Sequence, residues 1–203
     1  MESQRGEAAR SATARRILAA AEARYRFYGF RKTTMADIAD DLDMSAANLY
    51  RYFDNKQALA AEVVRSLLER RLAAVERAVQ QAADETGPRL HAFTAELLAQ
   101  THSVCVEQPR VSELVDIITE GHRQIVHSHN AAEQALIARI LERDPRPGVR
   151  RNATGLSKQI HSALSMFRAP VFMAYYPRAE LQRRAAQVTD LILRGLGEHA
   201  ERQ

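Results

Sequence analysis

The apolar residues of this chain recur at three- and four-residue intervals, which is the spacing of residues on one face of an α-helix. No stretch alternates apolar and polar residues at the two-residue period of a β-strand, and glycine and proline are scarce. Between residues 12 and 28 the periodic positions run from Ile17 to Tyr28, and Gly29 then marks a helix end. The pattern predicts an all-α protein.

Two short helices are expected after this first one. Thr33 and Thr34 open a helix that Asp37 helps to cap, and the helix breaks at Asp43, a residue that tolerates positive φ. Ser45 caps a second helix that extends to Phe53. Two helices can pack at a steep angle when small and apolar residues lie at their contact, and the sequence provides such residues at Ile38, Ala39, Leu42, Met44 and Leu49. This arrangement predicts a helix-turn-helix, in which the second helix reads DNA.

The pattern of the remaining residues predicts a larger helical body. A long helix is expected from Asn55 to about Gln81, and Gly87-Pro88 begins a second region of helices about twenty residues long. The last two helices are expected at about 152–175 and 178–198. We therefore expect a flexible basic arm at residues 1–11, a helix-turn-helix DNA-binding domain at 12–60, and an all-α effector-binding and dimerisation domain at 61–203.

The expected DNA-contacting residues surround the second helix of the motif. The small side chains of Ala46 and Ala47 let the backbone approach base edges, while Asn48 can read adenine and Arg51 can read guanine. The remaining candidates cap this helix or suit phosphate contacts: Ser45, Thr33, Thr34, Tyr50, Tyr52 and Lys56.

Charge supports a nucleic-acid partner without establishing one. The formal net charge is +4, and basic residues crowd the first sixty positions, opposed by the acidic group Asp37, Asp40, Asp41 and Asp43. No apolar run is long enough to span a bilayer, and the amino terminus does not resemble a signal peptide, so we expect a cytoplasmic protein with no membrane partner. Cys105 is the single cysteine, which excludes an intramolecular disulfide.

Residues 13–60 resemble the amino-terminal domain of the TetR/AcrR family of bacterial repressors. The matching segments are Tyr28-Gly29-Phe30, Lys32-Thr33-Thr34 and Leu49-Tyr50-Arg51-Tyr52-Phe53, followed by Lys56. The chain departs from the family pattern at Asp43, where glycine is usual, and at Ala46-Ala47, where lysine or glycine is frequent. The resemblance implies a homodimer joined through its last two helices, a palindromic double-stranded operator, and release by an unknown small molecule. Two half-sites also supply the specificity that one recognition helix lacks.

An effector pocket is expected among the helices between Gly87 and Tyr175, lined by a mixture of apolar and isolated polar side chains. The candidates are Phe93, Leu97, Thr101, His102, Cys105, Ile118, His122, His161 and Phe167. Most of them also suit an ordinary hydrophobic core. The histidines and Cys105 show no spacing typical of a metal site, so neither a metal nor another cofactor is expected.

Three alternatives to a repressor are compatible with the sequence to different degrees. An enzyme finds no support, because the chain has no Gly-x-Ser-x-Gly elbow, no phosphate-binding Gly-rich loop and no His-Glu-x-x-His motif. A helical adaptor that binds protein would lack the steep salt dependence of DNA binding. An activator with the same architecture also remains open.

Overall fold

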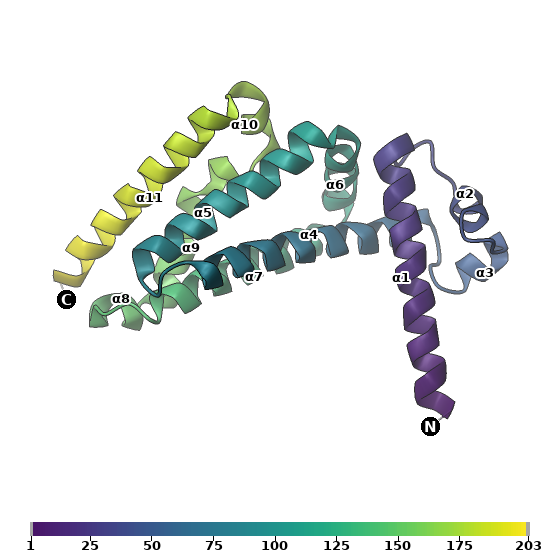
Figure 1. The fold of residues 1–203 in the computed structure, drawn as a ribbon, viewed down its shortest axis with the longest axis horizontal. Coiled ribbons are helices and arrows are strands. Elements are labelled where there is room, and N and C mark those ends of the chain that lie inside the picture. Colours follow the sequence, from purple (N-terminus) through teal and green to yellow (C-terminus); the bar gives the residue numbers. More distant parts are fainter. Residues whose placement is uncertain (1, 202–203) are drawn as a thin grey trace. The chain divides into compact units, whose positions relative to one another are not determined.

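The computed structural model describes the backbone of residues 2–201 and the side chains of residues 10–169 and 172–197. Helices account for all regular structure in this range, which confirms the all-α expectation (Figure 1). The α-helices are α1 (Glu2–Tyr28), α2 (Met35–Asp40), α3 (Ala46–Tyr50), α4 (Lys56–Gln81), α5 (Thr86–His102), α6 (Pro109–Gly121), α7 (Arg123–Leu141), α8 (Pro147–Arg151), α9 (Ala153–Ala163), α10 (Pro170–Tyr175) and α11 (Arg178–Glu201). A π-helix, η1 (Ser103–Glu107), and a 3₁₀-helix, η2 (Ser165–Phe167), complete the set.

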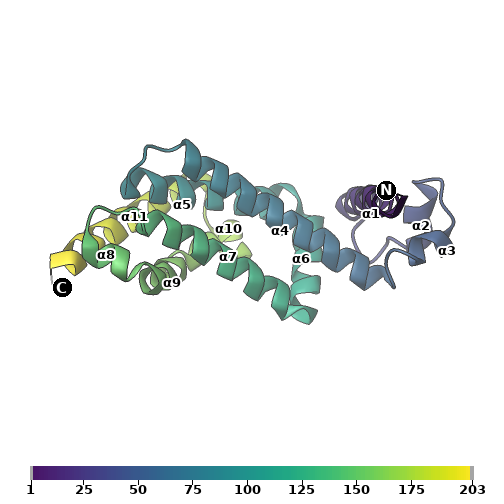
Figure 2. The ribbon, with the colours of Figure 1, turned by 90° about the horizontal axis from the view of Figure 1, so that it is seen from below.

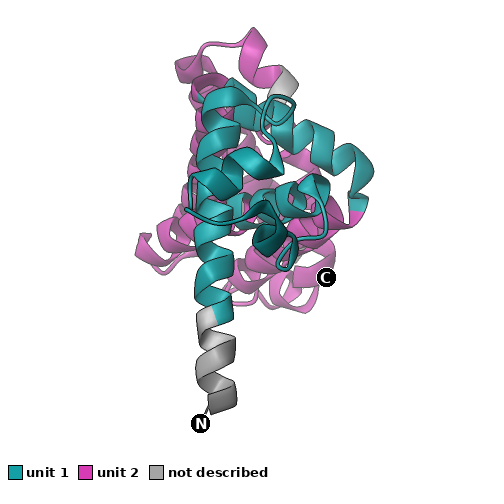
Figure 3. Cartoon of the chain, turned by 90° about the vertical axis from the view of Figure 1, so that its right-hand side faces the viewer, with its two compact units in different colours: residues 1–67, 108–123 teal, residues 68–107, 124–203 magenta. Residues whose placement is uncertain are grey.

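The chain divides into two compact units (Figure 3). The first unit comprises residues 1–67 and 108–123, and the second comprises residues 68–107 and 124–203. Helix α4 therefore contributes to both units, while α6 groups with the amino-terminal helices through its packing on α1. The expected arm at residues 1–11 lies largely outside the described side chains, and α1 begins at Glu2.

Local interactions define each helix boundary in the first unit. Gly29 ends α1 with a φ of +85°, a conformation that is available to glycine without strain. Thr34 and Asp37 form a reciprocal capping box at the start of α2. Asp43 adopts a φ of +52° in the turn before α3, and the Ser45 side chain then accepts a hydrogen bond from the Asn48 amide. These features confirm the sequence-based interpretation of the motif.

Helices α1, α2 and α3 and the start of α4 make up the amino-terminal part of the first unit (Figure 2), and each contributes side chains to a small apolar core. Its fully buried members come from all four helices and include Ile17, Tyr25, Ile38, Ala39, Leu49 and Leu59. Tyr25 packs edge-on against the Phe30 ring, with the two ring centroids 5.7 Å apart. The exposed face of α3 is therefore set by the burial of Leu49 on its opposite side.

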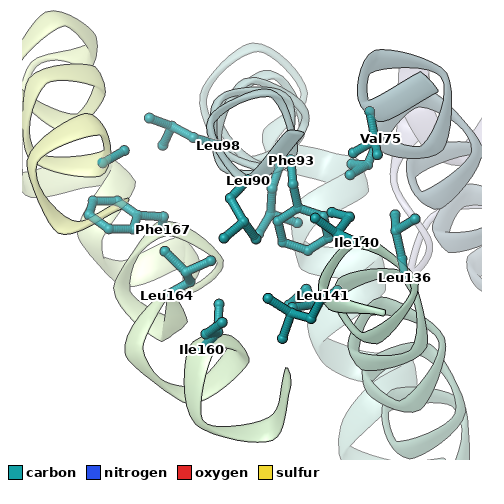
Figure 4. Close-up of a cluster of buried hydrophobic side chains, with 14 of the residues drawn as sticks. Val75, Leu90, Phe93, Leu98, Leu136, Ile140, Leu141, Ile160, Leu164 and Phe167 are labelled. Carbon is teal, nitrogen blue, oxygen red and sulfur yellow. The ribbon is translucent and has the colours of Figure 1, made fainter. Parts of the chain in front are cut away.

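The second unit has a larger apolar core (Figure 4). Side chains from α4, α5, α7 and α9 meet there, and those labelled in the figure include Val75, Phe93, Ile140, Ile160 and Phe167. Helix α11 packs along α5 and contributes the buried side chains of Leu181, Ala185 and Leu196. Within the described part of the chain, no helix is both long and apolar enough to cross a membrane.

Two predicted helices are shorter than the sequence suggested. The helix expected at 45–53 ends at Tyr50, because the amides of Arg51 and Tyr52 bond to carbonyls only three residues back and tighten the last turn. The helix expected at about 152–175 is divided into α9, η2 and α10. Pro170 accounts for the second break, since Ala169 before it is extended and proline cannot donate the missing hydrogen bond.

Candidate nucleic-acid interface

Helix α3 and the residues that flank it expose polar and small side chains, while Leu49 is buried. Ser45, Ala47, Tyr50 and Arg51 are exposed, while Ala46, Asn48 and Tyr52 are partly exposed. The side chain of Tyr50 is 49% exposed although the residue is large and aromatic. This face combines one amide, one guanidinium and hydroxyl groups around a small-residue amino end, which is the chemistry that major-groove reading requires.

The two threonines expected at a phosphate have different environments. Thr34 is exposed at the amino end of α2, and its hydroxyl donates to Asp37 Oδ2 over 2.7 Å. Thr33 is buried, and its hydroxyl donates to the Gly29 carbonyl over 2.9 Å. The Thr33 side chain is therefore unavailable to DNA and instead holds the turn between α1 and α2.

Lys56 is also engaged within the first unit. Its Nζ donates to the carbonyls of Phe30 and Thr33 over 3.1 and 3.0 Å, and it lies 4.4 Å from the centre of the Phe30 ring. Two of the three ammonium N–H groups are thus directed at the turn after α1. The geometry favours a role for Lys56 in joining α4 to that turn rather than in contacting phosphate.

Arg24 neutralises part of the acidic group that opposes the basic surface. Its guanidinium makes a two-pronged contact with Asp41, with distances of 2.6 and 2.7 Å, and lies 3.6 Å from Asp37. The hydrogen bond from Arg24 holds the pKa of the Asp41 carboxyl below its usual value, whereas the bonds from Thr34 have the larger effect on the pKa of Asp37. Arg24 thereby fixes α2 against α1.

Arg10 reaches the same face from α1. Its guanidinium lies 6.0 Å from the centre of the Tyr52 ring. The sequence provided no signal for this pairing or for that of Arg24 with Asp41, because the partners are distant in sequence. Arg10 therefore adds a basic group beside Tyr52, whereas Arg24 pairs with the acidic side chains at α2.

Residues 17–63 match the profile of bacterial regulatory proteins of the tetR family. The matched range spans α2 and α3 and the parts of α1 and α4 that pack against them. Over this range the chain is similar to the DNA-binding head of the tetR family. Helix α3 is the second helix of the helix-turn-helix within the matched range.

Solved structures of regulators share the fold over nearly the whole chain. A protein from Mesorhizobium loti MAFF303099, inferred to be a TetR-family transcriptional regulator, has a TM-score of 0.69 at 19% identity and covers 91% of this chain and 96% of its own. A protein from Pseudomonas aeruginosa PAO1, inferred to be a transcriptional regulator, has a TM-score of 0.68 at 18% identity, covering 93% and 92%. The TetR family repressor AlkX from Dietzia sp. strain DQ12-45-1b, implicated in biodegradation of n-alkanes, has a TM-score of 0.59 at 17% identity, covering 91% and 95%.

These identities establish a common fold and no more. No curated protein matches the chain. The structure nevertheless shows in which unit each expected pocket residue lies and how far it is buried.

Most expected pocket residues lie in the second unit, and several are core. Phe93, Leu97 and Phe167 are completely buried, and the Thr101 hydroxyl donates to the Leu97 carbonyl over 2.8 Å. Cys105 is half-buried within the π-helix, a type of segment that often occurs at functional sites. His102 is half-buried, and its Nδ1 has no hydrogen-bond partner.

The other three candidates do not form one group. Ile118 and His122 belong to the first unit, where Ile118 is buried on α6 and His122 is exposed just after that helix. His161 lies in the second unit on α9 and is 5% exposed. Its Nε2 is 3.1 Å from Oε2 of Glu133, a buried carboxylate that the sequence did not single out. No set of three metal-ligating side chains occurs among the described residues.

Proposed function

We propose that this protein is a dimeric transcriptional repressor that binds a palindromic operator and is released by a small molecule. The observation that carries the proposal is the α3 face, where Asn48 and Arg51 lie opposite the buried Leu49 in a TetR-family head. Asn48 and Arg51 read bases, and Thr34, Tyr50 and Tyr52 contact phosphates that set the position of the head on the duplex.

Selection of bound fragments from a random DNA pool tests this proposal. We expect enrichment of a two-fold symmetric sequence with half-sites about one helical turn apart. Each bidentate base contact contributes roughly 1–3 kcal/mol of discrimination, so a variant carrying both Asn48→Ala and Arg51→Ala loses at least about tenfold in operator preference. Arg151→Ala is the control, because it removes an exposed arginine from α8 in the second unit. Retention of full operator preference by the double variant would contradict the base-reading assignment.

Salt dependence separates a DNA-binding protein from a protein-binding adaptor. Each phosphate that a protein neutralises steepens the fall of log K against log salt by about 0.9. A dimer that engages several phosphates per head should show a slope of several units. An adaptor would show a shallow slope and no selected sequence.

The dimer interface is assigned to the last helices. Along α11, Leu191 is 63% exposed and Val188 and Ile192 are partly buried, whereas Leu196 belongs to the core of its own subunit. Contact with a second copy would cover the apolar side chain of Leu191. Leu191→Glu is expected to yield monomers in sedimentation experiments, and the exposed control Gln182→Glu on the same helix is expected to leave the dimer intact.

Release by an effector is proposed to occur through a population shift. An effector that binds two arrangements of the heads unequally favours one of them, and operator affinity changes accordingly. Helix α4 runs from the head into the second unit, and α6 contacts α1 although it is flanked in sequence by elements of the second unit. These two helices are the connections through which an effector in the body can influence the heads.

A further inference from the structure

A buried ionic cluster occupies the second unit, centred on Glu133 of α7, whose side chain is 1% exposed. Nitrogen atoms of four side chains surround this carboxylate. Oε1 is 3.2 Å from an Arg71 guanidinium nitrogen and 2.9 Å from His129 Nε2. Oε2 is 2.7 Å from an Arg168 guanidinium nitrogen and 3.1 Å from His161 Nε2. The cluster therefore joins α4, α7, α9 and the segment after η2.

Positive charge exceeds negative charge in this cluster. His161 Nδ1 lies 3.4 Å from the Gln134 amide nitrogen and 3.5 Å from an Arg168 nitrogen, and both of these nitrogens are hydrogen-bond donors. Two guanidinium groups, those of Arg71 and Arg168, oppose the single carboxylate of Glu133. Within the described part of the chain, Arg71 and Arg168 form ion pairs with Glu133 alone.

Both arginines retain an unused donor. The Nε atoms of Arg71 and Arg168 are buried without a hydrogen-bond partner, and the two side chains are only 16% and 15% exposed. Burial lowers the pKa of Arg168, and the charge of Arg71 lowers it further, in opposition to Glu133. For Glu133, the bonds from both histidines and the charges of both arginines outweigh burial and hold its pKa well below the usual range.

We propose that this cluster binds the acidic group, a carboxylate or a phosphate, of an organic anion. A buried charge that lacks a counter-charge is costly, and an anion at the free Nε donors removes that cost. Arginine suits this task because its planar fork matches both acidic groups. The inference deepens the proposed function, on which it rests, by stating the chemical class of the effector.

Two partly buried apolar side chains neighbour the arginines of the cluster in sequence. Leu72 follows Arg71, Met166 lies two residues before Arg168, and both are partly buried against the core. Cys105 of the π-helix interacts electrostatically with Arg71. A divalent metal is the less suitable occupant, because the two guanidinium groups repel a cation.

Binding of three matched probes to the full-length, DNA-free protein tests the inference. The probes are octanoate, octyl phosphate and octanol, measured by calorimetry at one pH and one ionic strength. We expect at least one of the two anions to bind roughly ten- to hundredfold more tightly than octanol, because a charged hydrogen bond is lost with the neutral head. The two anionic arms distinguish a carboxylate effector from a phosphate effector.

Two variants separate a loss of anion binding from a loss of folding. Arg168→Gln should abolish the preference for anions, and the exposed control Arg151→Gln should retain it. Asn130 accepts a hydrogen bond from Arg168, so the isosteric Asn130→Asp supplies a second carboxylate within the cluster. This variant should raise the melting temperature of the free protein and lose anion binding.

Several outcomes would overturn the inference: no probe binds, octanol binds as well as the anions, or Asn130→Asp lowers the melting temperature. Operator binding is measured separately without any probe. Intact operator recognition together with absent anion binding refutes the anion site alone. Anion binding by a protein that selects no DNA sequence refutes the proposed function alone.

Discussion

Lys56 provides the sharpest test of the interpretation of the head, because the sequence and the structure suggest different roles for it. Its ammonium group makes two hydrogen bonds to the carbonyls of Phe30 and Thr33 and lies over the Phe30 ring. A hydrogen bond to a charged group contributes about 1.5–3 kcal/mol net, and a cation–π contact contributes about 0.5–2 kcal/mol. Lys56→Met keeps the apolar stem and removes all three interactions. Since such contributions are not additive and the side chain is half-buried, we expect a loss of about 2–4 kcal/mol.

Denaturant unfolding and the salt dependence of operator binding together distinguish a structural role of Lys56 from a phosphate contact. Lys56→Met should lower the unfolding midpoint while leaving the salt slope of operator binding unchanged at temperatures where the variant is folded. Lys32→Met is the matched control, because it removes the same charge from an exposed position, and we expect a change within about 0.5 kcal/mol.

The opposite pair of results would refute this reasoning. If Lys56 contacts phosphate, a dimer of the variant loses about 1.8 units of salt slope, that is about 0.9 for each of two contacts. An unchanged unfolding free energy combined with that loss of slope would restore the phosphate role and exclude the structural one.

Three further predictions concern stability. Asp43→Gly should remain within about 1 kcal/mol of the parent, because glycine adopts the φ of +52° freely, whereas Asp43→Val should lose about 1–2 kcal/mol in the same denaturation assay. Although burial opposes it, hydrogen bonding from Arg146 and Thr86 lowers the pKa of Asp144 from 3.8 to about 2, which corresponds to about 2 kcal/mol. Because the pKa is lowered on folding, that stability is present above about pH 4 and lost as the pH falls toward 2. In melting temperatures measured across this pH range, Asp144→Asn should therefore show a smaller decrease than the parent protein. Phe167→Ala should cost about 3–5 kcal/mol because the ring is fully buried, and Phe172→Ala, at a half-buried position, should cost less when compared by the same unfolding measurement.

Local chemistry explains why the head could be predicted from its sequence. Gly29, Thr34, Asp43 and Ser45 act through their own φ angles or through hydrogen bonds to residues at most four positions away. Such interactions depend on residue type and spacing alone, so the sequence by itself determined where the helices of the motif begin and that Leu49 is buried. The same spacing made the resemblance to TetR-type heads recognisable.

Tertiary structure decided everything that depends on partners distant in the chain. Lys56 contacts a carbonyl 26 residues away, and Arg24 contacts an aspartate 17 residues away, which changed the role assigned to the first and revealed the second. The group around Glu133 is assembled from positions between 71 and 168, and no periodic pattern relates them. Helical periodicity reports which face of a helix is apolar, but only the packing of helices determines which charges are buried together, and therefore where an anion would find its counter-charge.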